Sequence, residues 1–434
     1  MSSPTTLDKI VSLSKRRGFI YPSSEIYGGF SSVYDYGPLG VELKNNIKSH
    51  WWQTMVHQRL DIVGLDSAIF MHPKTWQASG HVDNFIDPLV ECKQCHHRFR
   101  ADSLQEDKQT VCPDCGGELT PPKNFNLLVE AKLGLTDDNK DPVYLRGETC
   151  QGIYLNFLNV YNSTRQKIPF GIAQIGKSFR NEITPKNFTF RTREFEQMEM
   201  QYFVKPDEKK SMDVFQQWKQ QRFDWYLDLG IAKDKLRLQP HPKDKLAHYA
   251  KAAEDIEYKT DFGGWKEMEG IHHRGDWDLG RHSEFSGKDL SVTDDQGDSF
   301  IPWIVETSAG ADRATLIFLL EAYREDADKK RVYLSLDPRL APFKAAVFPL
   351  LKNKPDIVSK AQQVYQRLSS KTNIAWDERG NIGKRYYSQD EIGTPYCITI
   401  DFDTLEDDTV TVRHRDTTKQ ERVGLDKLED FLKY

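Results

Sequence analysis

Three glutamates stand in sequence settings that are typical of a small binding pocket. Glu148 lies in the run Arg-Gly-Glu-Thr-Cys-Gln-Gly, Glu199 lies in a run that alternates polar and apolar residues, and Glu306 directly precedes Thr-Ser-Ala-Gly. Carboxylates that surround a small cavity suit a substrate ammonium group. The sequence therefore offers a candidate site for an amine ligand.

Four arginines could bind an anion in the same cleft. They are Arg180, Arg191, Arg193 and Arg313. A guanidinium group matches two phosphate oxygens at once, and Arg313 falls in the first turn of an expected helix, where free N–H groups favour an anion. Taken singly, such side chains are more often solvated or ion-paired. Their joint placement favours a polyphosphate site.

Four of the six cysteines form two Cys-x-x-Cys pairs that are 16 residues apart: Cys92, Cys95, Cys112 and Cys115. Paired thiolates with this spacing are typical of a zinc ribbon. A closed shell of four thiolates leaves no open position for a substrate, so we expect a structural Zn²⁺ in an insert over residues 88–120. His96 and His97 are expected to be solvated residues rather than ligands.

A pair of strands is predicted over residues 168–204. Along the returning strand, Gln197 and Glu199 alternate with Met198 and Met200. Since successive side chains of a strand point to opposite faces, polar groups should lie on one face of the sheet and apolar groups on the other.

Other elements are expected around this hairpin. A long amphipathic helix is predicted just past Pro38, over residues 41–60. Residues 301–310 predict a strand that ends in small residues, and residues 311–327 predict the helix that follows it.

The pattern changes beyond residue 330. Residues 332–336, 396–400 and 409–412 predict strands, and residues 344–351 predict an apolar helix. Alternating strands and helices are typical of an α/β unit, so we expect a separate C-terminal domain over residues 331–434.

Composition excludes several classes of protein. The 434 residues are 38% hydrophobic and 29% charged, with a formal net charge of -5, which is typical of a soluble globular chain without a nucleic-acid-coating surface. No run is apolar enough for a signal peptide or a membrane-spanning helix, so we expect a cytoplasmic protein without a membrane partner. Walker-type hydrolysis, serine hydrolysis and zincin proteolysis are not expected.

Several motifs together resemble the class II aminoacyl-tRNA synthetases. Residues 176–182 and 190–199 resemble motif 2 of that class, and residues 310–313, which open a helix, resemble motif 3. The segment 36–40, Tyr-Gly-Pro-Leu-Gly, resembles motif 1.

Within the class, the chain is similar to the dimeric glycyl-tRNA synthetases. The segments 146–152, 261–265 and 306–310 resemble catalytic segments of that family, and residues 390–393 and 400–403 resemble its anticodon-binding domain. The resemblance covers nearly the whole chain.

This resemblance implies an α+β fold. We expect a catalytic domain over residues 1–330, an antiparallel sheet flanked by helices and carrying the zinc-ribbon insert, followed by an α/β anticodon-binding domain. It also implies a homodimer that uses glycine, ATP, Mg²⁺ and tRNA(Gly). Glycine and ATP would form glycyl-adenylate and pyrophosphate, and the glycyl group would then move to the 3′ end of the tRNA.

The resemblance also implies roles for individual residues. Arg180, Arg313 and Glu267 would be the catalytic residues, with Arg180 at the α-phosphate. The ammonium of glycine would lie among the three glutamates, in a pocket expected to comprise Arg100, Glu148, Phe195, Glu196, Gln197, Met198, Glu199, Arg274, Glu306, Thr307, Ser308, Ala309 and Gly310. The expected ATP site comprises Arg180, Asn181, Glu182, Phe190, Arg191, Thr192, Arg193, Glu194, Phe195, Glu267, Met268, Gly310, Ala311, Asp312 and Arg313.

Two alternatives stay open from the sequence. One is a synthetase-like enzyme that delivers an activated amino acid elsewhere or forms dinucleoside polyphosphates. The other is a non-catalytic RNA-binding paralogue, which would be expected to lack the arginines of motif 2 or motif 3. Arg180 and Arg313 are both present, which favours the ligase.

Overall fold

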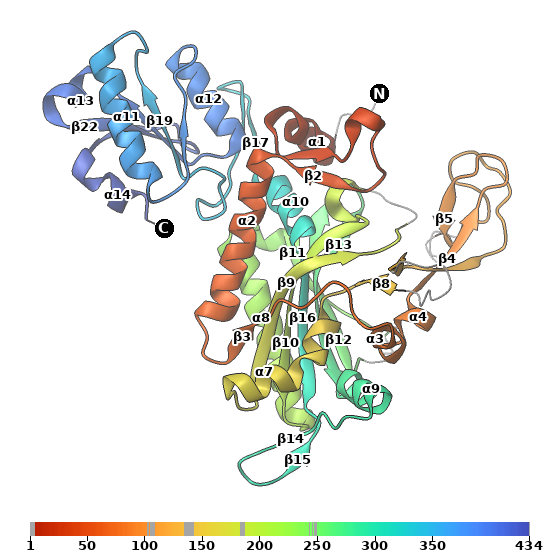
Figure 1. The fold of residues 1–434 in the computed structure, drawn as a ribbon. Helices are drawn as coiled ribbons and strands as arrows, with labels where there is room; N and C mark the ends of the chain where they lie inside the picture. Colours follow the sequence, from red (N-terminus) through yellow and green to blue (C-terminus); the bar gives the residue numbers. More distant parts are fainter. Residues whose placement is uncertain are drawn as a thin grey trace.

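The computed structural model describes residues 5–101, 104, 109–133, 143–182, 187–242, 244, 246 and 250–433. A large central sheet forms the body of the molecule, and a small insert and a C-terminal domain lie on opposite sides of it (Figure 1). Among the described residues, no helix combines the length and the apolar character that crossing a membrane requires.

The central sheet has seven strands in the order β11-β12-β13-β16-β10-β9-β3. Neighbouring strands are antiparallel except for the parallel pair β3 and β9. Their bounds are Ile62–Gly64 (β3), Phe170–Phe179 (β9), Glu194–Val204 (β10), Leu236–Pro240 (β11), Ala252–Thr260 (β12), Gly264–Gly275 (β13) and Trp303–Gly310 (β16). The antiparallel catalytic sheet expected from the sequence is therefore confirmed.

The two faces of this sheet differ in chemistry, as the alternation along β10 predicts. Met198 and Met200 join the main core, which is closed by helices α1 (Thr6–Arg17), α2 (Pro38–Trp52), α8 (Glu208–Asp228) and α10 (Ala311–Ala322). Gln197 and Glu199 point to the opposite face, toward the start of α6 (Cys150–Leu155). There the Thr149 backbone N–H donates to Gln197 and the Thr149 hydroxyl donates to Glu199. Helices α7 (Phe157–Thr164) and α9 (Trp277–Ser286) also border that face. One face is thus a core and the other can hold a polar site.

Both predicted helices of this body are shorter in the structure. The helix expected over residues 41–60 is α2, which gives way to one π-helical turn, Gln53–His57. The helix expected over 311–327 ends at Ala322, because the chain there enters strand β17 (Tyr323–Asp326), which pairs with β18 (Arg331–Leu334). Tertiary pairing overrides the helical pattern at that point.

One sequence pattern proves to be coincidental. Residues 171–178, Gly-Ile-Ala-Gln-Ile-Gly-Lys-Ser, match the phosphate-loop pattern G-x-x-x-x-G-K-S. They lie within the extended strand β9 and not in a loop before a helix. This run therefore does not form a phosphate-binding loop.

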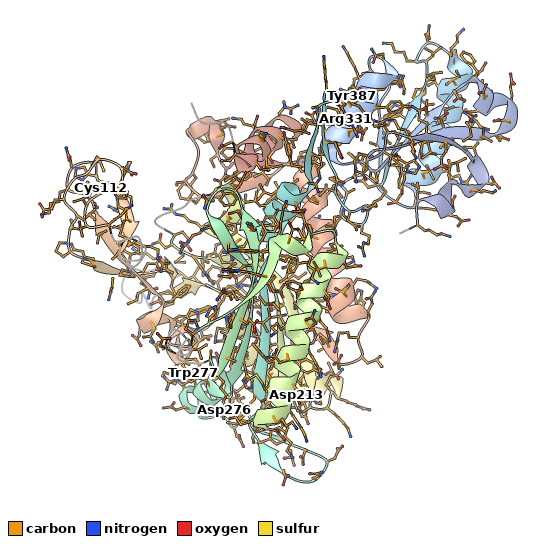
Figure 2. The ribbon with its side chains drawn as sticks, turned by 180° about the vertical axis from the view of Figure 1, so that it is seen from behind. Cys112, Asp213, Asp276, Trp277, Arg331 and Tyr387 are labelled. Atoms are coloured by element: carbon orange, nitrogen blue, oxygen red, sulfur yellow. The ribbon has the colours of Figure 1, made fainter. Side chains whose placement is uncertain are left out.

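The insert is a three-stranded sheet in the order β5-β4-β6. Its strands are β4 (Ile86–Glu91), β5 (Arg98–Arg100) and β6 (Lys123–Asn126). Cys112, with the cysteine cluster, lies at the end of the insert far from the central sheet (Figure 2). Smaller elements complete this body: β1 (Ile20–Pro22), β2 (Tyr34–Tyr36), α3 (Lys74–Ala78), α4 (His81–Asn84), β7 (Val129–Ala131), β8 (Val143–Leu145), β14 (Val292–Thr293) and β15 (Ser299–Phe300).

The C-terminal domain has a five-stranded mixed sheet in the order β20-β19-β21-β22-β23. Its strands are β19 (Ala345–Pro349), β20 (Ile374–Trp376), β21 (Tyr396–Ile400), β22 (Thr409–His414) and β23 (Gln420–Gly424). Its helices are α11 (Pro355–Ser369), α12 (Ile382–Ile392), α13 (Phe402–Asp407) and α14 (Leu428–Phe431). Since α11 and α12 pack on opposite faces, the unit is an α/β domain, as predicted.

One prediction for this domain is wrong. Residues 344–351 were expected to form an apolar helix, but they contain the central strand β19, which is buried on both faces. A short, continuously apolar run has no period that distinguishes a helix from a fully buried strand.

A buried ion pair fixes α8 to the central sheet. Arg222 donates from Nε and Nη2 to the two carboxylate oxygens of Glu269, at 2.7 and 3.1 Å, and the Tyr226 hydroxyl adds a third hydrogen bond at 2.8 Å. Glu269 is fully buried in β13, two residues from Glu267. Removing one partner of such a pair leaves an uncompensated charge in the core.

We therefore predict that Glu269→Gln destabilises the protein by about 3 kcal/mol or more, measured as the loss of unfolding free energy in urea. As a control, Asp295→Asn removes the carboxylate of the exposed pair with Lys167, whose charged atoms lie 2.7 Å apart, and should change the unfolding free energy far less, because solvent screens an exposed pair. Equal effects of the two substitutions would contradict this account of the core.

Candidate active site

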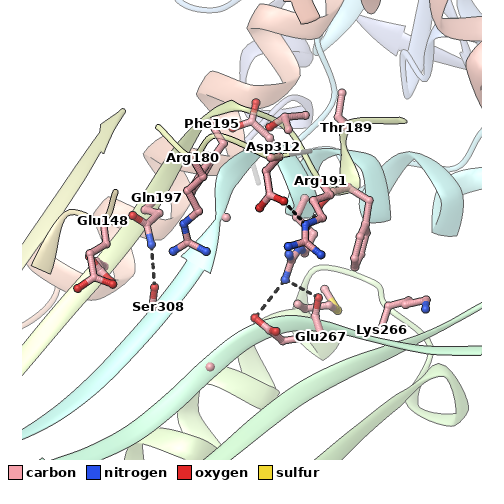
Figure 3. A pocket seen from close by; sticks show the side chains of 18 of the residues that line it. Glu148, Arg180, Thr189, Arg191, Phe195, Gln197, Lys266, Glu267, Ser308 and Asp312 are labelled. Atoms are coloured by element: carbon pink, nitrogen blue, oxygen red, sulfur yellow. Dashed lines mark hydrogen bonds and ion pairs between the residues drawn. The ribbon is translucent and has the colours of Figure 1, made fainter. Parts of the chain in front are cut away.

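The polar face of the central sheet holds a cavity of about 540 Å³. Strands β10, β13 and β16 supply most of its walls, and the segment between β9 and β10 supplies much of the rest. Glu148, Gln197 and Ser308 lie on one side of the cavity, and Arg191, Lys266 and Glu267 on the other (Figure 3). The cavity thus has an acidic end and a basic end, as the sequence predicts.

The three predicted glutamates all line the cavity. Glu306 is the most strongly bonded: its carboxylate accepts from His272 Nδ1 at 2.8 Å, Gln201 Nε2 at 2.7 Å and Arg274 Nη1 at 3.1 Å. Burial alone would raise its pKa, but Arg274 and His272 lower the pKa of Glu306 to about 2. Glu306 is therefore an ionised and already neutralised carboxylate.

Glu148 contacts a histidine and a thiol. His81 Nε2 lies 3.2 Å from its Oε1, and the Cys150 thiol donates to the same oxygen at 2.9 Å. Burial opposes ionisation, yet His81 and Arg274 hold the pKa of Glu148 well below its usual range. Cys150 is a fully buried packing residue, and burial raises the pKa of its thiol well above the usual value.

Glu199 differs from the other two glutamates. The Thr149 hydroxyl donates to it, but within the described part of the chain no lysine, arginine or histidine forms an ion pair with it. Burial, together with the negative charges of Glu306 and Glu148, raises the pKa of Glu199 to about 8. A cationic ligand at this place would supply the missing counter-charge.

The wall between the two ends of the cavity is polar and tightly bonded. The Gln197 side-chain oxygen accepts from the Ser178 hydroxyl at 2.7 Å and from the Thr149 backbone N–H at 3.1 Å, and its Nε2 donates to Ser308 at 3.4 Å (Figure 3). Position 270 has room only for glycine, since a Cβ on this residue would lie 2.6 Å from the His272 ring. The acidic end is therefore small and rigid.

At the basic end, aromatic rings and carboxylates orient the arginines. The Arg180 guanidinium lies 5.1 Å from the Phe85 ring and 5.2 Å from the Phe195 ring, and its Nε donates to the Gly147 carbonyl oxygen at 3.1 Å. Cation–π contacts of this kind fix a guanidinium group without neutralising it.

Arg313 lies in the first turn of α10, as predicted. Its Nη1 donates to the carboxylate of Glu267 at 3.1 Å, and its guanidinium lies over the Phe190 ring at 4.4 Å. Arg191 donates to Glu182 at 2.6 Å. Met268, Thr192, Gly310, Asp312 and Arg100 also line the cavity.

Eight predicted site residues do not line the cavity. Two pair elsewhere: Glu196 with Lys44 and Lys48 of α2, at 2.7 and 3.0 Å, and Glu194 with Lys177 at 2.7 Å. Arg193 turns away and donates to the Glu182 carbonyl oxygen at 2.9 Å. The others are Asn181, Met198, Thr307, Ala309 and Ala311. For most of them strand alternation is the reason, because neighbours of cavity residues on β10 and β16 must face the core.

Five further residues line the cavity that sequence reasoning did not find: Thr189, Trp265, Lys266, Gly270 and His272. The most important is His272, since it bonds Glu306. It stands two residues before the predicted Arg274 on the same strand, so the alternation that identified Gln197 and Glu199 could have found it. His81, which pairs with Glu148, gave no comparable signal.

The four predicted zinc ligands come together in the insert. The Sγ atoms of Cys92, Cys95, Cys112 and Cys115 all lie within 4.8 Å of one another. Backbone N–H groups of residues 94 and 95 point at Cys92 Sγ, at 3.4 and 3.5 Å. This set of four thiols fits a tetrahedral Zn²⁺.

The neighbouring histidines are not part of the thiol cluster. The exposed rings of His96 and His97 pair instead with Glu91 and Asp114, at 3.2 and 2.7 Å.

Comparisons with known proteins agree with this arrangement. Residues 129–323 match the model of the class II tRNA synthetase core domain (G, H, P, S and T), and residues 344–434 match the anticodon binding domain. The chain is 53% identical to the glycine–tRNA ligase of Thermobifida fusca, with 98% of this chain and 97% of the relative covered. It is 52% identical to that of Treponema denticola, with 99% and 96% covered, and 51% identical to that of Borreliella burgdorferi, with 98% and 97% covered. The chain therefore belongs to the glycine–tRNA ligase family of class II aminoacyl-tRNA synthetases.

Proposed function

We propose that this protein activates glycine with ATP and transfers the glycyl group to the 3′ end of tRNA(Gly). The observation that carries this proposal is Glu199, a buried carboxylate without a cationic partner in the described structure, at the closed end of a cavity whose other end presents arginines. An amino acid places its ammonium among carboxylates and its carboxylate toward the arginines. The cavity has that polarity.

The first step would be an in-line displacement. A carboxylate oxygen of glycine attacks the α-phosphorus of ATP, a new P–O bond forms, and the bond to the bridging oxygen breaks to release pyrophosphate. In the second step, a hydroxyl of the terminal ribose attacks the glycyl carbonyl carbon and AMP leaves. Neither step needs a nucleophile from the protein, so positioning and charge stabilisation supply the catalysis.

At the acidic end, Glu199 would bind the ammonium directly. Glu148, in contact with His81, and Glu306, paired with Arg274 and His272, would shape the pocket. Any side chain on the α-carbon would have to displace part of this bonded wall, whereas glycine has none. Excluding larger amino acids by such a wall needs no second editing site.

At the basic end, Arg180 would contact the α-phosphate and Phe195 would pack against adenine. Glu182 would bind the adenine edge, and Arg191 and Arg313 would contact the outer phosphates. Because Arg313 is bonded to Glu267 in this structure, we infer that the triphosphate takes the place of Glu267 as the partner of Arg313. Glu267 would then be free to hold Mg²⁺, a hard cation that prefers oxygen ligands and neutralises phosphate charge.

We further propose a two-domain organisation with residues 1–330 catalytic and residues 331–434 binding the anticodon. The boundary falls in the turn between β17 and β18. A cytoplasmic homodimer accords with the family.

The proposed activity can be tested by ATP–pyrophosphate exchange with each amino acid in turn, without tRNA. We expect exchange with glycine alone, because only glycine fits the bonded acidic end. Exchange with another amino acid would keep the reaction class but overturn the three-glutamate pocket. No exchange with any amino acid would favour the non-catalytic paralogue.

Replacing Glu199 tests the ammonium contact. Glu199→Gln removes the charge without changing the size, and we expect the KM for glycine to rise at least about tenfold while the KM for ATP stays within about twofold. Steady-state exchange kinetics measure both constants. Glu254→Gln on strand β12, which breaks the pair of Glu254 with Lys219 of α8, serves as the control and should leave both unchanged. An equal loss for glycine and ATP would remove this role from Glu199.

The zinc site makes a separate prediction. Elemental analysis should find about one Zn²⁺ per chain, and Cys112→Ser should lower the metal content and the melting temperature, because the thiolates hold the insert together. The buried Cys397 lies in the C-terminal domain, apart from the cluster, so Cys397→Ser should leave the metal content unchanged. A protein free of metal with an unchanged melting temperature would exclude this site.

A further inference from the structure

A buried carboxylate of the insert contacts two arginines of the cavity. Asp87, on β4, lies 2.9 Å from Arg100 Nη1 through one carboxylate oxygen and 3.6 Å from Arg191 Nη2 through the other. Its side chain is only 7% exposed. Arg100 and Arg191 line the cavity, whereas Asp87 does not. Since both arginines contact Asp87, Arg100 lies beside Arg191 at the basic end, and not among the glutamates of the glycine pocket to which the family resemblance assigned it.

Asp87 reduces the repulsion between two neighbouring guanidinium groups. Two guanidinium groups that converge on one carboxylate also repel each other, and both are partly exposed to the cavity, at 27 and 33% of their side-chain surface. Asp87 offsets that repulsion with one oxygen for each cation. Arg191 also donates to Glu182. Its guanidinium group is therefore held both by Glu182 of the motif 2 segment and by Asp87 of the insert.

The insert positions Asp87 through its own strands. Strand β4 (Ile86–Glu91) begins two residues before the expected start of the insert and therefore includes Asp87; Cys92 follows it directly. Strand β5, which carries Arg100, begins three residues after Cys95. The register of the pair sets Leu89 opposite Arg100. The turn that holds the first two thiols therefore also fixes where Arg100 lies relative to Asp87.

We propose that Asp87 is a positioning residue that holds Arg100 and Arg191 in place for the phosphates of ATP, so that the thiol-bearing insert forms part of the nucleotide site. The inference rests on the proposed function for the identity of the nucleotide. Asp87 does not itself touch the cavity and acts through the two arginines.

Asp87→Asn tests this inference. It keeps the size of the side chain but removes the charge, and we expect the KM for ATP in glycine-dependent exchange to rise about tenfold or more, with the KM for glycine within about twofold. A loss that is only structural would change both constants or lower the melting temperature without separating them. Equal changes in the two constants, or none, would overturn the proposal.

A matched control lies on the same strand. Glu91 pairs with Arg98 at 2.9 Å at the other end of β4, where its side chain is 35% exposed and does not line the cavity, so Glu91→Gln should leave the KM for ATP unchanged. Coupling provides a second check: in an Arg191→Ala background, Asp87→Asn should raise the KM for ATP clearly less than it does in the wild type, because its partner is gone. Equal effects in both backgrounds would contradict an action through Arg191.

Two further measurements keep the test decisive. If Asp87→Asn does not fold, Asp87→Glu retains the charge but displaces the carboxylate, and should raise the KM for ATP in the same selective way by a smaller factor; an unchanged KM would overturn the proposal. Calorimetric binding of ATP without glycine separates this inference from the proposed function. Weaker ATP binding by Asp87→Asn supports it even if the wild type shows no exchange, and equal binding overturns it.

Discussion

The site depends on one buried carboxyl group, Glu199, for which the described part of the protein supplies no counter-charge. Other buried carboxylates of the chain have cationic partners: Glu269 has Arg222, Asp312 has Lys44, and Asp390 is held between Arg331 and Arg413. Burying a charge without a partner is costly, so an exception at a cavity wall indicates that a ligand completes it. Among the described residues, Glu199 is that exception, whereas its neighbour Glu306 is paired with Arg274 and its neighbour Glu148 contacts His81.

The central sheet brings the polar residues of the site together in one layer. The antiparallel pairs set Glu199 opposite Ser308 on one side and opposite Gln174 on the other, so the polar residues of adjacent strands form one layer. On the reverse face, α8 and α10 pack against Met198 and Met200 and keep the strands in register. The same rigidity places Arg180 and Arg313 at a fixed distance from the acidic end, and reactions that proceed by positioning need such fixed distances.

The sequence predicted those parts of the structure that local residue patterns determine. The alternation along β10 separated Gln197 and Glu199 from the core, and the spacing of the four cysteines predicted their cluster. Contacts between distant segments, such as His81 with Glu148 or Asp87 with Arg191, could not be predicted from the sequence, because no local period encodes them. It was wrong for residues 344–351, where burial on both faces removes the period altogether. The family resemblance supplied the order of the motifs, but its continuous runs included residues that strand geometry turns toward the core.

The most direct measurement of the central claim is the number of protons released when glycine binds. With a pKa of about 8 in the empty pocket, Glu199 is mostly protonated at pH 7, and the carboxylate that pairs with an ammonium must first lose its proton. Titration calorimetry at pH 7 in two buffers of different ionisation enthalpy should therefore detect release of about one proton per glycine, falling toward zero as the pH rises above 8. Glu199→Gln should release none. Binding without proton release, or the same release by the variant, would show that Glu199 is not the unpaired charge on which the site depends.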